Sequence, residues 1–152
     1  MEMAGKGVSV TLFDMPDTIK IAKGIIKASG LKNIDFIRGD FLSDAVGNGY
    51  DLIFISQVIH SFSAENNAGL LGKCREALNP GGRIAVQEFY LDKNRAAPVS
   101  SALFSVNMLV NTAGGRCYSP REIRQWLSGL GFTGIREKKL DDTVLVTGKK
   151  SE

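Results

Sequence analysis

Four ionisable side chains each follow a short apolar run in this sequence, where a β-strand would end. Asp14 closes VTLFD, Asp40 follows FIRG, His60 lies four residues beyond DLIFIS, and Glu88 ends RIAVQE. In open α/β sheets, ligands bind beyond the carboxyl ends of the strands. A carboxylate at such a strand tip can accept two hydrogen bonds from ribose hydroxyls. The pattern therefore predicts a ligand site at one edge of a sheet.

Each of these four residues also has an ordinary structural explanation. Asp14 could cap the helix that follows it, and Asp40 could form a turn. Glu88 could be a charge at a sheet edge, and a lone histidine is often a structural residue. The ribose interpretation of Asp14 also lacks a partner, because the glycine-rich loop expected about 20 residues earlier is absent from this sequence. Convergence on one rim is what favours a ligand site.

The elements that would position these residues alternate between strand and helix. The clearest signal is a capping box, in which Ser119 and Glu122 flank Pro120 at the first helical position. Periodicity and turn residues predict strands over residues 8–13, 34–39, 51–56, 83–89, 132–140 and 143–149, and helices over residues 16–29, 64–78 and 120–130.

This alternation predicts an α/β fold with a mostly parallel sheet and right-handed crossovers. Only Asp141 and Asp142 separate the last two strands, so these form an antiparallel hairpin at one edge. At 152 residues, with 43% hydrophobic residues, the chain is expected to be a single domain, residues 1–152.

Composition argues against several function classes. The net charge of +3 comes without a basic stripe interleaved with aromatic residues, which argues against nucleic acid as a partner. No apolar run has membrane-spanning length, which argues against a membrane partner. One histidine and two cysteines without CxxC spacing cannot form a His/Cys zinc cluster, so no metal is expected. Two free thiols and no signal peptide predict a cytoplasmic protein.

Four stretches of the chain resemble class I S-adenosylmethionine (SAM)-dependent methyltransferases. The similarity is to the small-molecule O-methyltransferases that include plant caffeate O-methyltransferase and bacterial natural-product enzymes. These stretches are VTLFDMP, FIRGDFL, QVIHSFSAENNAGLLGKCREALNPGGRIAVQEFYLD and MLVNTAGGRCYSPREIRQWLSGLGF, in the family's order. The resemblance implies the C-terminal part of a Rossmann-like methyltransferase sheet, without the family's first strand and glycine-rich loop.

The same resemblance implies a cofactor site for SAM. Asp14 matches the acid that holds the ribose of the cofactor. Asp40 and Phe41 match the pair that grips adenine, with the acid accepting from the amino group and the ring beside the purine. Ser56 stands near the cofactor, where plant members carry a lysine.

For catalysis, the resemblance makes His60 the general base and Glu88 the residue that orients it. Met108, Asn111 and Thr112 fall where the family lines its pocket for the methyl acceptor.

The chain departs from the family around this histidine. Ser61 and Phe62 replace an acid and a tryptophan, and Cys117 replaces a second acid that flanks the histidine in plant members. These departures are typical of the bacterial-type branch.

The implied function is SAM-dependent O-methylation of a small-molecule hydroxyl, with an aromatic or polyketide-like acceptor.

Two alternatives stay open beside that function. One is a methyltransferase-like remnant that binds no cofactor by itself. The other is the same fold serving another reaction, as in the anthracycline hydroxylases that resemble these methyltransferases.

The resemblance also predicts the strand order. In the family a further strand lies between the first and third strands of this chain, so the expected order is second, first, third, fourth, sixth and fifth. Loss of that strand would leave backbone groups of two apolar strands unpaired, which is an association hazard. We therefore expect a homodimer, a swapped oligomer or closure of the gap.

Overall fold

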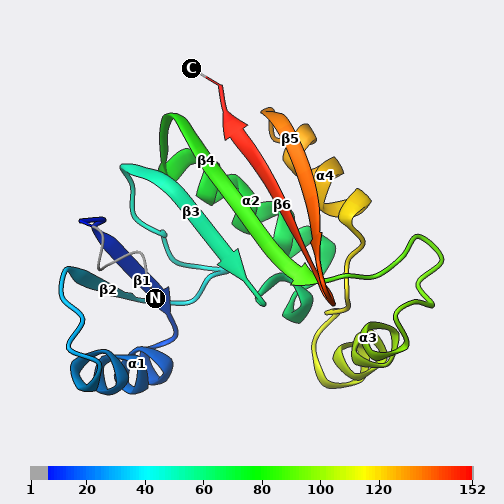
Figure 1. The fold of residues 1–152 in the computed structure, drawn as a ribbon, viewed down its shortest axis with the longest axis horizontal. Coiled ribbons are helices and arrows are strands. Elements are labelled where there is room, and N and C mark those ends of the chain that lie inside the picture. The colour runs from blue at the N-terminus through cyan, green and yellow to red at the C-terminus, as the bar shows by residue number, and fades with distance from the viewer. Residues whose placement is uncertain (1–6, 152) are drawn as a thin grey trace. The chain divides into compact units, whose positions relative to one another are not determined.

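The computed structural model describes residues 7–151, and the chain forms two compact units, Met1–Gly47 and Asn48–Glu152. Each unit has its own sheet and helical cover (Figure 1). The assignment of residues 1–152 to a single domain stays a prediction. Within residues 7–151, no helix combines the length and apolar character needed to cross a bilayer.

The first unit is a parallel strand–helix–strand motif. Strands β1 (Val10–Asp14) and β2 (Ile34–Arg38) pair in parallel, and helix α1 (Pro16–Ala28) connects them. Pro16 begins the helix at a position where its missing N–H costs nothing, and Ile19 and Ile26 are its buried residues. Asp14 pairs with Arg38 in the ladder, so the carboxyl ends of both strands lie together.

The second unit is built on a four-stranded sheet in the order β3-β4-β6-β5. Its strands are β3 (Tyr50–Ser56), β4 (Leu78–Phe89), β5 (Phe132–Leu140) and β6 (Thr143–Lys150), and its helical elements are η2 (Ile59–Ser61), α2 (Ala64–Ala77), α3 (Val99–Asn111) and α4 (Pro120–Gly129). Strands β3 and β4 are parallel, whereas β6 runs antiparallel to both β4 and β5. The sheet is therefore mixed, with the expected hairpin at its edge.

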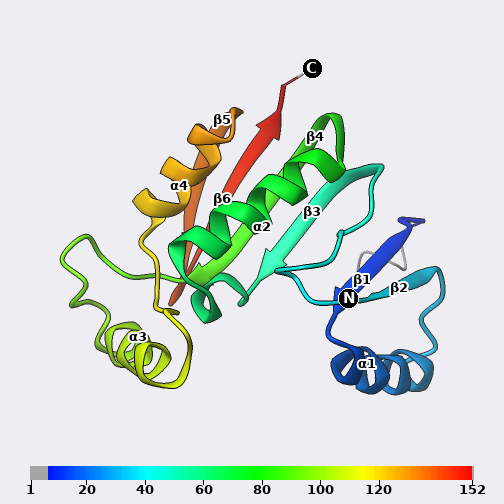
Figure 2. The ribbon, with the colours of Figure 1, turned by 180° about the vertical axis from the view of Figure 1, so that it is seen from behind.

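One face of this sheet carries the core of the second unit. Helices α2 and α4 lie side by side on that face (Figure 2). Val86 of β4 pairs with Val146 of β6, and both are fully buried. Leu71 of α2 and Leu127 of α4 are also fully buried. Burying a side chain of this size contributes about 1.5–3 kcal/mol, so this layer fixes the strands that carry the candidate site.

The strand order expected from the sequence is confirmed within each unit. Strand β2 neighbours β1, and β3, β4, β6 and β5 follow in the expected order. The part of the expected order that sets β1 next to β3, and the expected closure of the gap between them, stay predictions.

Helix α4 begins with the capping box that the sequence predicts. The Ser119 hydroxyl accepts from the Glu122 N–H, and the Glu122 carboxylate accepts from the Ser119 N–H at 2.8 Å. Two guanidinium groups also reach this carboxylate, that of Arg95 at 2.9 Å and that of Arg116 at 2.8 Å. Glu122 thus joins the cap of α4 to two separate segments of the chain.

This cap predicts a stability that depends on pH. Burial acts to raise the pKa of Glu122, but hydrogen bonds from Arg116 and Ser119 outweigh it and lower the pKa from its ordinary 4.5. A depressed pKa stabilises the fold above about pH 4.5, and this contribution is lost as the pH falls through the folded-state value. Glu122→Gln is expected to lose less unfolding free energy than wild type between about pH 7 and pH 3, because its amide does not titrate.

Urea unfolding at the two pH values measures this difference. The matched control is Glu65→Gln, because Glu65 occupies the first turn of α2 without closing a capping box. An identical pH dependence in wild type and Glu122→Gln would contradict the assignment.

Candidate active site

His60 lies in η2, a single turn of 3-10 helix that follows strand β3. Gln57 ends the strand in a left-handed conformation, with a φ of 57°, and its N–H donates to the carbonyl of Gln87 at 3.0 Å. A positive φ is uncommon for a residue other than glycine, and such conformations concentrate at functional sites. The chain thereby leaves the sheet sharply and places His60 beside the end of β4.

The buried carboxylate of Glu88 bonds to both the backbone and the histidine ring of this turn. It is 2% exposed, so it is a buried group and not the exposed edge charge of the structural alternative. Oε1 accepts from the N–H groups of Val58 at 2.8 Å and Ile59 at 2.9 Å, and Oε2 contacts Nδ1 of His60 at 2.8 Å. Because an ionised carboxylate only accepts, Nδ1 of His60 carries the proton of this contact, and in the neutral imidazole Nε2 then keeps its lone pair.

Aromatic rings flank the imidazole on the other sides. The Phe104 ring of α3 meets it edge-on at 5.0 Å between centroids, and the Phe89 ring lies at 5.9 Å. These two phenylalanines also contact each other at 4.6 Å. His60 itself is 9% exposed, so the base candidate sits in a largely apolar, water-poor environment.

Cys117 cannot supply the negative charge of the acid that it replaces. It is 2% exposed, and burial together with the nearby charge of Glu88 raises its pKa to about 11. Its thiol is therefore neutral at physiological pH. Glu88 is the one acid that the structure pairs with His60 among the described residues.

In the first unit, Asp14 lies at the tip of β1 but does not cap α1. The N-cap of α1 is Met15, and this cap has no side-chain hydrogen bond. One oxygen of Asp14 accepts from the Met15 N–H at 2.8 Å, and no hydrogen bond from residues 7–151 reaches the other. The capping explanation of Asp14 is therefore wrong, and a half-buried carboxylate points from the strand end.

Asp40 and Phe41 lie just beyond β2 at the same end of this small sheet. Gly39 donates its N–H to the carbonyl of Asp14 at 3.1 Å, which keeps the two strand ends together. Asp40 accepts from the Leu42 N–H at 2.8 Å, so it does form a turn, as its structural explanation predicts. The Phe41 ring rests on that of Phe13 at 5.1 Å. This tip therefore offers two carboxylates and an aromatic platform.

The remaining sequence-predicted residues lie in the second unit. Ser56 is exposed at the end of β3. Met108 is half-buried on α3, the helix that carries Phe104 to His60. The Asn111 amide bonds to Asn107, and the Thr112 hydroxyl donates to the Met108 carbonyl at 2.7 Å. Thr112 thus caps the end of α3 as well as standing near η2. Within residues 7–151, no group of three His, Cys, Asp or Glu side chains could hold a metal ion.

Sequence reasoning missed two residues at this site, Asn67 and Tyr118. Both bond to carbonyl groups of the turn that carries His60, Asn67 to those of Ile59 and Phe62 and Tyr118 to that of Phe62. A signal for Asn67 was present, because this polar residue falls on the apolar face of α2 with Leu70, Leu71 and Cys74. Tyr118 carries no comparable signal.

Comparison with known proteins identifies the family. A family model described as an O-methyltransferase domain matches residues 5–133. The chain belongs to this O-methyltransferase family. Among its relatives, the 3-hydroxy-5-methyl-1-naphthoate 3-O-methyltransferase of Streptomyces sahachiroi is 34% identical over 130 residues.

Solved structures of O-methyltransferases share this fold. PigF with SAH, from Serratia, superposes with a TM-score of 0.88 at 29% identity over 95% of this chain. Human N-acetylserotonin methyltransferase in complex with SAM gives 0.84 at 31% identity over 97%. The chain spans 37% of the Streptomyces enzyme, 44% of PigF and 42% of the human enzyme.

Proposed function

We propose that this chain serves SAM-dependent O-methylation of a small-molecule hydroxyl group, with His60 as general base. The observation that carries the proposal is the buried pair of His60 and Glu88, which leaves Nε2 of the imidazole able to accept a proton. Family membership supports the type of reaction.

The chemistry divides between cofactor and chain. When bound, SAM would supply a methyl group on a sulfonium sulfur, and this sulfur departs as a neutral thioether that needs no protonation. Nε2 of His60 accepts the proton of the acceptor hydroxyl, and Glu88 stabilises the resulting imidazolium through Nδ1. Full proton transfer from an ordinary phenol to an ordinary imidazole is uphill by about 5 kcal/mol. The proton therefore leaves as the oxygen attacks, and not in an earlier step.

The tip of the first unit fits part of the proposed cofactor. Asp14 offers a carboxylate oxygen that no described residue occupies, as a ribose hydroxyl would require. Asp40 and Phe41 are proposed to grip the adenine, with Phe41 already supported by Phe13. Ser56 is proposed to contact the cofactor from the end of β3.

The acceptor is proposed to be an aromatic or polyketide-like molecule. Phe89 and Phe104 beside His60 suit a flat apolar ring, which gains contact energy from such neighbours. Met108, Asn111 and Thr112 are proposed to line the same pocket from the end of α3. The naphthoate relative, whose name specifies an aromatic acceptor, supports this choice.

We further propose that residues 1–152 act as one catalytic domain in a cytoplasmic homodimer or swapped oligomer. Helix α3 supports association, because Val99, Leu103, Val106 and Val110 recur at helical spacing and are each more than half exposed. Sedimentation analysis is expected to show a dimer or larger species. A monomer at every concentration tested would contradict this proposal.

Calorimetric titration with SAM tests the proposed function. We expect saturable binding of SAM to the protein, followed by methyl transfer to a phenolic acceptor. Absence of binding at millimolar SAM in a folded protein would overturn the proposal and favour a remnant that binds no cofactor.

A further inference from the structure

The turn that carries His60 is held from two sides by different elements. Glu88 of β4 takes the N–H groups of Val58 and Ile59 and the ring of His60. The carbonyl groups of Ile59 and Phe62 in the same turn have other partners. Those partners are Asn67 and Tyr118, to which the sequence and the family comparison assign no role.

Asn67 binds both carbonyl groups that bracket the histidine. Its Nδ2 donates to the carbonyl of Ile59 at 2.8 Å and to that of Phe62 at 3.2 Å. Asn67 is fully buried, and its Oδ1 has no hydrogen-bond partner among the described residues. An unpaired buried polar atom is costly, so packing alone does not explain an asparagine at this position. The amide therefore serves the turn and not the core.

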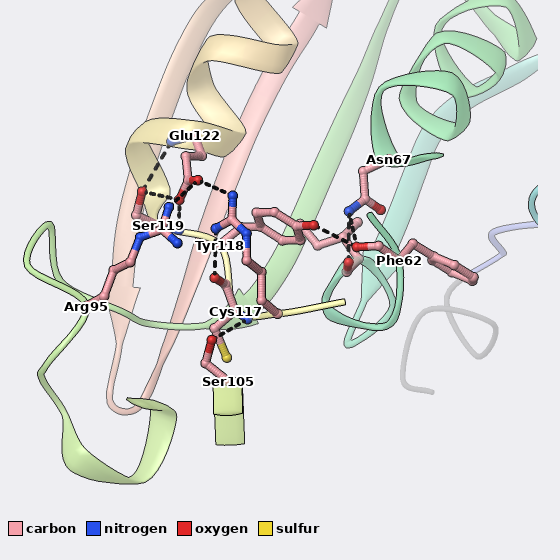
Figure 3. Close-up of polar contacts among 10 residues, drawn as sticks. Phe62, Asn67, Arg95, Ser105, Cys117, Tyr118, Ser119 and Glu122 are labelled. Atoms are coloured by element: carbon pink, nitrogen blue, oxygen red, sulfur yellow. Dashed lines mark hydrogen bonds and ion pairs between the residues drawn. The ribbon is translucent and has the colours of Figure 1, made fainter. Parts of the chain in front are cut away.

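Tyr118 binds the same turn through its hydroxyl group. Its hydroxyl donates to the carbonyl of Phe62 at 2.7 Å, and Figure 3 shows the phenol reaching this carbonyl beside Asn67. The Tyr118 ring packs against Trp126 of α4 at 4.8 Å, and the guanidinium of Arg116 covers its face at 4.3 Å. Arg116 is fixed in turn by Glu122 of the α4 cap.

Gly115 brings the same segment directly against the histidine. A Cβ at this position would clash with the carbonyl oxygen of His60 and with Oγ1 of Thr112. The backbone leading to Tyr118 therefore touches the backbone of the base itself.

We propose that Asn67 and Tyr118 are positioning residues that hold His60 in place through the carbonyl groups of Ile59 and Phe62. Neither residue touches the reacting atoms. Their effect is to keep the imidazole on Glu88 in one tautomer and one orientation, so that Nε2 meets the acceptor. The role in catalysis rests on the proposed function, whereas the effect on the imidazole does not.

Tyr118→Phe tests this proposal with minimal damage, because it removes the hydroxyl and keeps the ring on Trp126 and Arg116. The matched control is Tyr90→Phe, since the Tyr90 hydroxyl makes no hydrogen bond within residues 7–151 and its ring lies under Lys139. Asn67→Leu removes both hydrogen bonds that the Asn67 side chain donates to the turn. If Asn67→Leu does not fold, Tyr118→Phe decides alone.

The readout is the imidazole itself, because His60 is the single histidine of the 152-residue chain. Long-range proton–nitrogen NMR spectra are expected to show one tautomer in wild type and Tyr90→Phe. In Tyr118→Phe we expect averaging between the two tautomers of the His60 imidazole. In the full-length protein, kcat should fall about 10- to 100-fold with the KM for SAM unchanged.

An unchanged imidazole spectrum in Tyr118→Phe, with only thermal stability reduced, would overturn the proposal and make Tyr118 a packing residue. Failure of the proposed function would appear differently. His60→Gln would then keep full turnover, while the NMR comparison would still decide whether Tyr118 holds the imidazole.

Discussion

Replacing His60 with glutamine is expected to lower the turnover of methyl transfer by about 10²–10⁴-fold, the usual contribution of a positioned base. The glutamine amide can still donate to Glu88, so the turn keeps a partner in the place of Nδ1. It has no basic nitrogen to take the acceptor proton. The lost energy therefore belongs to the transition state, and the affinity for SAM should stay nearly unchanged.

Single-turnover rates and calorimetric SAM titration, measured on the same full-length preparations, separate these two quantities. Weakened SAM binding with normal single-turnover chemistry would instead make His60 a structural residue. Small effects on both quantities would likewise contradict its role as the base.

Asp14→Asn is expected to weaken SAM binding by about 1.5–3 kcal/mol, which is roughly tenfold to over a hundredfold in affinity. An ionised carboxylate can accept from two ribose hydroxyls, and such charge-assisted bonds are about twice as strong as neutral ones. The amide cannot accept both. Because the side chain does not cap α1, the unliganded protein should keep its melting temperature.

The matched control for this variant is Asp17→Asn, which removes the same charge from the first turn of α1. If the effect comes from net charge near the strand tip, both variants should weaken binding alike. If it comes from the ribose, only Asp14→Asn should do so. Equal affinities of wild type and Asp14→Asn for SAM would contradict the ribose assignment.

The elements with strong local signals could be predicted from the sequence. Pro16 and the Ser119–Glu122 capping box mark helix starts that the structure confirms, because these residues act within one turn of the chain. The pairing of the last two strands follows from a two-residue connection in the same way. In these cases the physical cause lies within a few residues of its effect.

Helix α3 could not be predicted in this way. It begins after Pro98 without a side-chain cap, and no acid opens it and no base closes it. Its apolar residues lie on more than one side, with Phe104 toward His60 and Leu103 exposed, so no polar face sets off an apolar stripe in the sequence. The tertiary setting of such a helix decides its conformation.

The candidate site was predictable as a set of residues but not as a set of contacts. Strand ends indicated His60 and Glu88, because parallel strands bring their carboxyl ends to one edge. The bond from Tyr118 spans 56 residues, and only packing of the whole unit creates it, whereas the bonds from Asn67 span 8 and 5 residues. Asp14 shows the converse, since a helix start next to an acid suggested a cap that does not form.

The two buried cysteines of the second unit, Cys74 and Cys117, can report local opening of the fold through their rates of alkylation. Burial raises the pKa of Cys74 to about 12 and helps raise that of Cys117 to about 11, so neither thiol reacts while the fold is closed. Alkylation must then wait for local opening, and its rate at each site reports the free energy of that opening. Cys74 reports on α2, whereas Cys117 reports on the segment beside His60. If Cys117 is alkylated earlier than Cys74, the segment beside His60 opens locally while α2 stays folded.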